Sequence, residues 1–531
     1  MRETNSQATA PNANRLLYAG FMAILAAGVG FSVRGGILGQ WAEKFGFTMS
    51  ELGTITGGGL TGFGLVIIAT SLFADKIGYG KIMASAFVLH FLSAVLTLAA
   101  PAAFEAGGKE SAYWCLFFGM LIFSIGNGLC EAVVNPLTAT LFPKNKTHYL
   151  NILHAGWPAG LVLGGLASFF MAAQVDSSGS VVRAAVDWKI QMCLFLVPVI
   201  IYGGMLLGQK FPPSEAASAG VSMGQMIGTL FAPLMIILLV IHAMVGYVEL
   251  GTDSWISKIT GSIMASPKAG LALFVYTSTL MFLLRFVAGP IVHKISPLGL
   301  LLVSAILGFA GLTMLGAANS IIFCVIAATV YACGKTFLWP TMLAVASERF
   351  PNGGAVSIGM LGGVGMLSAG LLGGPAIGFK QDYFASQYLS QASEATFDRY
   401  KADKENSFAG FRTVGLNGAK VGILEDGGKE LDRVGEILAS EHRQDANHEA
   451  MATWWAGARE FAADDKPKVV AAGIFGGRQA LKLTAYVPAV MAVLYLLLII
   501  GFKLAGGYKP VHLSDNPNLP DEPEALGTAE S

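Results

Sequence analysis

Long apolar runs dominate the chain. Windows of about 20 apolar residues, the length that crosses a bilayer as a helix, recur from end to end between short polar turns. An even number of spans puts both termini on one side, and basic residues in the connections, such as Lys144, Lys210 and Lys294, predict that this side is cytoplasmic. The twelve predicted spans are residues 15–41, 51–73, 81–101, 113–141, 149–173, 189–208, 228–256, 269–292, 298–316, 319–346, 354–379 and 482–504.

Composition supports a multi-pass membrane protein. Of the 531 residues, 54% are hydrophobic and 13% are charged, and the mean hydropathy is +0.59. The net charge is zero, so bulk electrostatics gives no reason to expect nucleic acid as a partner. The five cysteines fall in apolar spans at irregular spacing, which predicts buried small residues rather than disulfides or metal ligands.

The polar stretches divide the chain into domains. We predict a disordered N-terminus at 1–14 without a cleavable signal, a six-helix half at 15–208, a cytoplasmic linker at 209–227, a second six-helix half at 228–504 and a disordered tail at 505–531. A polar insert at 381–480 interrupts the second half on the non-cytoplasmic side. It is interpreted as a lineage insertion without function, or as a cap over the entrance or a partner-binding surface.

The two halves resemble each other as parallel repeats. Ala74-Asp75-Lys76-Ile77-Gly78 after the second span matches Val292-His293-Lys294-Ile295-Ser296 after the eighth. Glycine-rich stretches at 54–64 and 362–374 indicate helices that pack closely. The fold class predicted is therefore an all-α membrane protein with two pseudo-symmetric six-helix halves and a solute site between them.

Four charged residues stand out among those inside the predicted spans. They are Arg34, Glu131, Glu249 and Lys335, on the first, fourth, seventh and tenth spans, which face the centre of such a bundle. A charge at the bilayer centre costs about 2.5–3.5 kcal/mol on insertion scales, so it persists when it is paired, wetted or functional. We expect Arg34, Glu131 and Lys335 to contact substrate, and Glu131 and Glu249 to exchange protons. Two structural ion pairs that only join helices are the alternative.

Further residues extend this predicted site. The candidate substrate ligands are Asn135, Asn151, His154, Trp157 and Trp339, because polar and aromatic side chains together suit a sugar. The alternatives are that a lone histidine is often only a packing residue and that tryptophans at span ends often anchor the protein at the membrane interface.

Gating residues are predicted at the span ends. Asp75 and Lys76 form a candidate conformational latch at a cytoplasmic turn. Arg285 and Asp253, which the windows place near the ends of their spans, are candidate gating residues.

Two motifs carry a family resemblance. The turn Ser71-Leu-Phe-Ala-Asp75-Lys76-Ile-Gly78 resembles the cytoplasmic signature of the major facilitator superfamily. Gly128-Leu-Cys-Glu131-Ala-Val-Val-Asn135-Pro136, followed by Leu150-Asn151-Ile-Leu-His154, resembles the fucose permease and glucose/galactose porter family, as does Val245-Gly-Tyr-Val-Glu249. The resemblance implies sugar symport coupled to protons or sodium, with Glu131 as a substrate or proton site and His154 as a sugar ligand. One departure is Gly35, which stands beside Arg34 where fucose permease has an aspartate.

These observations predict a secondary transporter rather than an enzyme, because no metal-ligand spacing or nucleophile motif is present. We expect a hexose symported with protons, without cofactor or metal, by a monomer in the bacterial inner membrane with both termini cytoplasmic. Sodium coupling stays open. The alternatives are transport of an anionic or zwitterionic solute such as a sugar acid, which the extra cations would hold, and a non-transporting receptor or scaffold.

Overall fold

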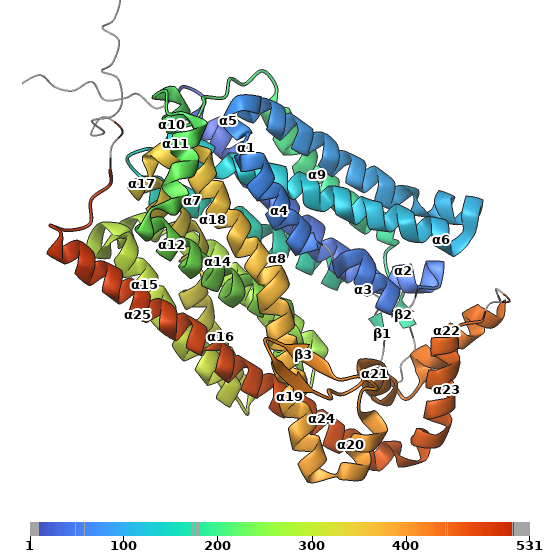
Figure 1. The fold of residues 1–531 in the computed structure, drawn as a ribbon. Coiled ribbons are helices and arrows are strands. Elements are labelled where there is room, and N and C mark those ends of the chain that lie inside the picture. The colour runs from blue at the N-terminus through green and yellow to red at the C-terminus, as the bar shows by residue number, and fades with distance from the viewer. Residues whose placement is uncertain are drawn as a thin grey trace, which may run out of the picture.

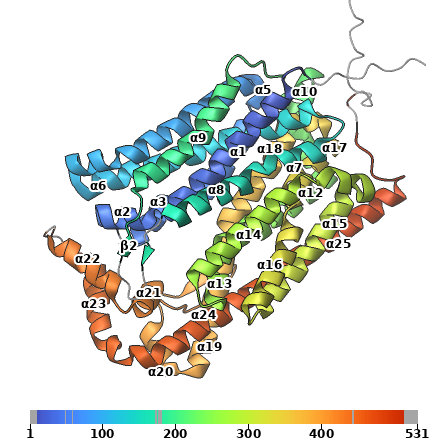
Figure 2. The same ribbon diagram turned by 180° about the vertical axis from the view of Figure 1, so that it is seen from behind.

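Two helical bundles lie side by side in the computed structural model (Figures 1 and 2). The structure describes residues 10–47, 49–57, 59–171, 174–175, 181–440, 442, 444–511 and 513. We call the end of the molecule that carries the linker α10–α11 the linker end, and the opposite end the insert end (Figure 1). Large apolar side chains such as Leu65, Ile322 and Leu497 are exposed on the outside of the helices, as expected for a surface that faces lipid.

The first half is formed by helices, with one short two-stranded hairpin. Helix α6 is interrupted at Gly107 and Gly108, whose non-helical backbone angles fold it into two antiparallel spans. The elements of the first half are α1 (Ala13–Gly36), α2 (Leu38–Phe45), α3 (Met49–Gly57), α4 (Gly59–Ser71), α5 (Ala74–Ile77), α6 (Tyr79–Leu141), α7 (Lys146–His154), α8 (Gly156–Met171), β1 (Gln174–Val175), β2 (Val181–Arg183) and α9 (Trp188–Leu206).

The linker and the second half follow. The linker contains α10 (Glu215–Ser218), α11 (Met223–Gly228) and η1 (Thr229–Phe231). The second half up to the insert contains α12 (Pro233–Gly246), η2 (Tyr247–Gly251), α13 (Thr252–Ile263), α14 (Pro267–Arg285), α15 (Ala288–Ala317), α16 (Ile321–Lys335), α17 (Leu338–Arg349), η3 (Pro351–Gly353), α18 (Gly354–Ser368), η4 (Ala369–Gly373) and α19 (Gly374–Ala392).

The number of spans agrees with the sequence pattern. Among the described residues, 11 helical stretches are long and apolar enough to cross a membrane. The stretch Tyr79–Leu141 counts as two because of its turn at Gly107 and Gly108, which gives the twelve predicted spans. The all-α membrane fold with two six-helix halves is therefore confirmed.

The insert has its own small core. Asp465 is fully buried and accepts hydrogen bonds from Thr396 at 2.8 Å and from the Arg399 Nε at 2.8 Å. The bond between Arg399 and Asp465 raises the pKa of the Arg399 guanidinium, and both bonds fasten α20 to α24. The elements of the insert are α20 (Glu394–Tyr400), β3 (Asn406–Phe408), β4 (Phe411–Thr413), α21 (Gly418–Asp426), α22 (Lys429–Ser440), α23 (Ala446–Ala458), η5 (Arg459–Phe461) and α24 (Ala462–Thr484), which runs on toward the last span. The last span is α25 (Tyr486–Leu504).

The chain termini fall partly within the description. Residues 1–9 and 514–531 lie outside the described residues, so the predicted disorder there stays a prediction. Helix α1 already begins at Ala13. In the tail, the Tyr508 hydroxyl donates to Glu348 Oε2 at 2.6 Å and the Val511 amide donates to the Glu348 carbonyl at 2.8 Å, so this part packs against α17.

Glycines bring neighbouring helix backbones into contact, as the glycine-rich stretches predicted. A Cβ on Gly246 would lie 1.9 Å from the Gly365 carbonyl oxygen, and one on Gly251 would lie 2.7 Å from the Gly373 Cα. Between the halves, a Cβ on Gly64 would lie 2.9 Å from the Gly363 carbonyl oxygen. Such close approach is the usual way in which helices associate in lipid.

This packing predicts the effect of one added methyl group. Gly246→Ala forces α12 away from α18 and should lower the free energy of unfolding by about 1–3 kcal/mol, the usual range for overpacking. Gly473→Ala, on α24, is the matched control, because among the described residues no atom outside the local helix backbone lies within 4 Å of the new Cβ, and it should leave stability unchanged or slightly raised. Unfolding in SDS titrations measures both. Equal stability of the two variants would contradict the proposed backbone contact.

Candidate functional site

Two proline residues create the centre of the site. A proline has no amide hydrogen, so the carbonyl four residues earlier in its helix loses a partner. Pro158 leaves the His154 carbonyl free at the break between α7 and α8, and Pro340 leaves the Thr336 carbonyl free at the break between α16 and α17. One break lies in each half of the molecule.

Arg285 satisfies both freed carbonyls. Its Nε donates to the Thr336 carbonyl at 3.0 Å, and its Nη1 donates to the His154 carbonyl in the other half. Its Nη2 donates to Glu249 Oε1 at 3.1 Å. The side chain is 1% exposed. A guanidinium with several donors in a fixed fork suits this arrangement, because one group joins both halves and an acid.

The structure adds to the sequence-based interpretation of Arg285. Arg285 is the last residue of α14, so it lies at a helix end as expected, but its side chain is buried and bonds to the other half at the short break between α14 and α15. The hydropathy window could not show these contacts. The signal that was available is one arginine in an apolar span together with a proline in each facing span.

The second ion pair lies beside the first. Lys335 Nζ donates to both carboxylate oxygens of Asp253, at 2.5 and 2.6 Å. Glu249 and Asp253 are four residues apart, and the chain between them passes through the π-helical turn η2, a feature that is frequent at functional sites. Both ion pairs therefore lie within the second half, rather than one cation and one anion coming from each half.

The first half contributes a hydrogen-bonded chain. Asn135 Nδ2 donates to Glu131 Oε2 at 2.6 Å, and Asn135 Oδ1 lies 2.8 Å from His154 Nε2, which must be the donor. Glu131 has no cation within 4.0 Å among the described residues, although its charge interacts with that of Arg285. Trp157, three residues after His154, is partly exposed and packs against Phe31 with 5.5 Å between ring centroids.

Arg34 lies outside this cluster. It is buried within the first half, where Nη2 donates to the Ser93 hydroxyl at 2.6 Å and the guanidinium carbon lies 4.1 Å from the centroid of Phe123 and 5.0 Å from that of Phe195. The expected group of four central charges is therefore not formed: Arg285 and Asp253 take part, and Arg34 does not. The pattern of apolar residues places Arg34 inside its span but does not show the direction in which its side chain points.

Polar contacts between the halves continue along α7 to the linker end. Thr147, Asn151 and His154 are spaced at i, i+4 and i+7, on one face of that helix. The Thr147 hydroxyl donates to Glu348 Oε1 at 3.0 Å, and Asn151 Nδ2 donates to the Thr341 hydroxyl at 3.3 Å. Helix α17 runs antiparallel to α7, which brings these pairs into register.

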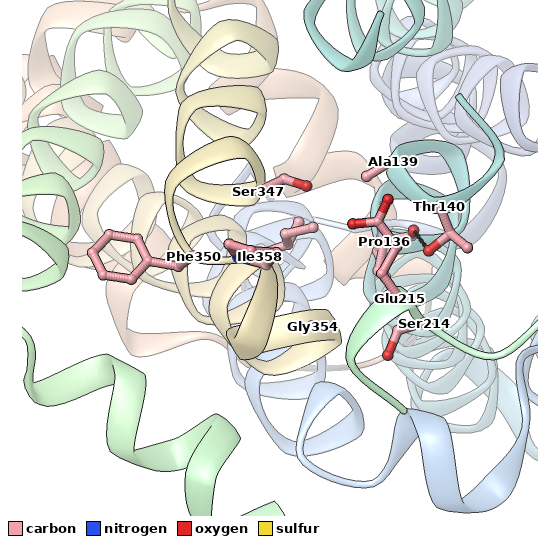
Figure 3. Close-up of a pocket in the computed structure, with 10 residues that line it drawn as sticks. Pro136, Ala139, Thr140, Ser214, Glu215, Ser347, Phe350, Gly354 and Ile358 are labelled. Atoms are coloured by element: carbon pink, nitrogen blue, oxygen red, sulfur yellow. Dashed lines mark hydrogen bonds between the residues drawn. The ribbon is translucent and has the colours of Figure 1, made fainter. Parts of the chain in front are cut away.

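The linker closes the same end. Asp75 accepts hydrogen bonds from the Ser214 amide at 3.1 Å and the Ser214 hydroxyl at 2.8 Å, and Lys146 pairs with Glu215 at 2.7 Å. Lys76 is exposed. A small pocket remains between the halves, with residues of α6 and the linker on one side and residues after Ala346 on the other (Figure 3). It is lined by Pro136, Ala139, Thr140, Ser214, Glu215, Ser347, Phe350, Pro351, Gly354 and Ile358.

The arrangement agrees with a family comparison. The model of the Major Facilitator Superfamily matches residues 20–374. The chain belongs to this superfamily. As a member, it is a multi-pass membrane transporter. No curated protein matches the chain.

Solved structures of superfamily transporters share the fold. The fucose:proton symporter FucP of E. coli is 16% identical, with a TM-score of 0.53, and the match covers 71% of this chain and 92% of that one. The proton:xylose symporter XylE has a TM-score of 0.56 at 13% identity, covering 72% and 91%. The human organic anion transporter MFSD10 has a TM-score of 0.52 at 14% identity, covering 69% and 93%.

The bridging role of Arg285 can be tested with a double-mutant cycle. Arg285→Lys keeps the charge but loses the fork, so at least one freed carbonyl stays unpaired, which should cost about 1–3 kcal/mol of unfolding free energy. In a Pro340→Ala background, the new amide of residue 340 can bond to the Thr336 carbonyl, so the same substitution should cost about 1 kcal/mol less. Unfolding in SDS titrations measures the cycle. Additive effects, within about 0.5 kcal/mol, would contradict the bridge.

Proposed function

We propose that this transporter carries a neutral, hydroxyl-rich solute of hexose size together with a proton, and that Glu131 carries the proton. The observation that supports this most is the difference between the acids of the central cluster. Glu249 pairs with Arg285 and Asp253 pairs with Lys335, whereas Glu131 has no cation within 4.0 Å among the described residues. A buried carboxylate without a cation is costly when charged, so proton uptake at Glu131 removes a charge that no ion pair offsets.

The charge count favours a neutral solute. With Glu131 protonated, the central cluster holds two acids and two bases that neutralise one another. An anion would have to compete with Asp253 for Lys335, and a cation would have to compete with Arg285 or Lys335 for an acid. A hydroxyl-rich solute needs only donors and acceptors, which Glu131, Asn135 and His154 offer, and an aromatic surface such as Trp157. The names of FucP and XylE describe proton symport of sugars, which agrees with this proposal.

Alternating access follows from where the contacts lie. Solute would enter at the insert end, taken as the outside of a bacterial inner membrane, and reach Glu131 near the midplane. Release toward the linker end, taken as the cytoplasm, would require the α7–α17 contacts and the Lys146–Glu215 pair to separate while the halves rock. In this scheme Asp75, bound to Ser214, holds the linker against the first half.

An anionic or zwitterionic solute is the second candidate. Arg34 has no carboxylate within 4.0 Å among the described residues, so one buried cation in the first half is not neutralised by an acid. The human structure named as an organic anion transporter shares the fold. A receptor or scaffold is a third candidate, and absence of uptake by purified protein in liposomes over a broad panel of sugars and organic acids would support it.

Replacement of Glu131 tests the proton role. In liposomes, Glu131→Gln should keep exchange of labelled sugar for unlabelled sugar but lose accumulation driven by a pH gradient, because the amide cannot take up a proton. Glu110→Gln, at an exposed acid on the same helix α6, is the matched control and should behave as the wild type. Unchanged accumulation by Glu131→Gln would exclude Glu131 as the proton carrier. If the wild type accumulates sugar only when a sodium gradient is imposed, the coupling ion is sodium rather than the proton.

Variants of the Lys335–Asp253 pair distinguish transport of a neutral solute from transport of an anion. Lys335→Met alone leaves Asp253 buried without its cation and should lower sugar uptake on the order of tenfold, whereas Lys335→Met with Asp253→Asn removes both charges and should restore most of it. If the solute is an anion held by Lys335, the double variant should transport as poorly as the single variant. Initial uptake rates in liposomes, corrected for the amount of folded protein, measure the difference.

A further inference from the structure

The insert contains an open cavity between α22 and α23. Its volume is about 510 Å³, which lies within the usual range for cavities that bind small molecules. Asp432 and Glu436 line it from α22, and Trp455 and Arg459 line it from the other side. The two helices lie at the insert end, beside α2 in both views (Figures 1 and 2). The cavity is therefore far from the central cluster of charges.

Each wall of the cavity is one face of a helix. Asp432 and Glu436 are four positions apart on α22. His448, Trp455 and Arg459 follow one another at intervals of seven and four positions along α23 and into the turn η5. Two acids on one wall thus face an aromatic ring and a cation on the other.

Hydrogen bonds hold both walls in place. His448 Nε2 lies 2.9 Å from the Leu431 carbonyl oxygen, which can only accept, so the histidine donates and joins α23 to α22. On α22, Arg433 donates to the Ala42 carbonyl of the first half at 3.3 Å. Trp455 is partly buried and packs against the small core of the insert. The cavity is therefore shaped before any ligand arrives.

The charged groups that line the cavity are free to bind a ligand. Asp432, Glu436 and Arg459 are exposed, and none of these side chains forms a hydrogen bond or an ion pair with another described residue. Arg433, next to Asp432 in the chain, instead pairs with Glu430 at 2.7 Å. Unused donors and acceptors of both signs thus face one space.

The mixture of groups selects the class of ligand. An apolar ligand would take water from three charged side chains without replacing its hydrogen bonds. A small ion would be attracted by one wall and repelled by the other. The hydroxyls of a sugar both donate and accept, and the apolar face of a sugar ring packs on an aromatic side chain, so a sugar satisfies both walls.

We propose that this cavity is a second sugar-binding site, separate from Glu131. Asp432 and Glu436 accept hydrogen bonds from hydroxyls of the ring, Arg459 donates to them, and Trp455 packs on its apolar face. The inference goes beyond the proposed function, because it concerns binding on the insert and not transport. It gives the insert a role of its own, as a surface that holds sugar at the insert end.

Chemical labelling of carboxylates tests the site in the full-length protein. Detergent-purified wild type is treated with a water-soluble carbodiimide and glycine ethyl ester, with and without L-fucose, D-glucose or D-xylose, and each labelled acid is quantified by peptide mass spectrometry. At about 100 mM of the sugar that protects best, on the order of a hundred times a millimolar Kd, labelling of Asp432 and Glu436 should fall at least about threefold. Glu449 on α23 and Glu394 on α20, exposed acids outside the cavity, are the controls and should be labelled equally with and without sugar.

Variants of the aromatic wall give the second readout. In Trp455→Ala, the sugar concentration that gives half protection should rise about tenfold, whereas Trp455→Phe, which keeps a ring, should stay within about threefold of the wild type. Asp465, fully buried in the core of the insert, reports folding, because it is labelled only if the insert unfolds. If Asp465 becomes labelled in Trp455→Ala, Asp432→Asn replaces that variant, with the same loss of protection expected at Glu436.

The outcomes separate this inference from the proposed function. Equal labelling of Asp432 and Glu436 with and without all three sugars, equal protection of the control acids, or unchanged half protection in the folded variant would overturn the sugar site. None of these results depends on transport. Wild-type protein that takes up no sugar in liposomes would overturn the proposed function alone.

Discussion

The guanidinium of Arg285 is the interaction on which the centre of this protein depends. In a bilayer, every backbone carbonyl must find a partner inside the protein, because lipid offers none. Pro158 and Pro340 break this rule in two facing helices, and Arg285 restores it in both while also pairing with Glu249. One side chain thus connects a freed backbone carbonyl in each half with the buried acid Glu249.

The helices around Arg285 are placed by close backbone packing. Glycine pairs bring α12 against α18, and the π-helical turns η2 and η4 lie where those two spans meet. A π-helical turn adds a residue to the helix and so changes the direction in which the following side chains point. Glu249 lies in η2 and Asp253 directly after it, within reach of Arg285 and Lys335. The acids are therefore positioned by a local departure from ideal helix geometry.

The polar contacts between the halves are unevenly distributed. Along α7 they extend from Arg285 at the centre to Thr147 and Lys146 at the linker end, and the linker and the tail pack on the same region. Near the insert end, Arg433 of the insert donates to the Ala42 carbonyl of the first half at 3.3 Å. The rocking motion proposed above would separate these hydrogen bonds, and the ion pair between Lys146 and Glu215 of the linker, one after another.

The sequence determined the membrane class, the twelve spans and the two-half fold, because lipid imposes a fixed length and an apolar composition on every span. The i, i+4 spacing of Glu131 and Asn135 is also a local property that can be read from the sequence, whereas the bond from His154 to Asn135 joins two helices and is seen only in the structure. Only the tertiary structure decided which charges meet. Hydropathy places Arg34 and Arg285 along their predicted spans but does not show which neighbour each one faces, because that depends on helix rotation and on packing around prolines and glycines far apart in the chain.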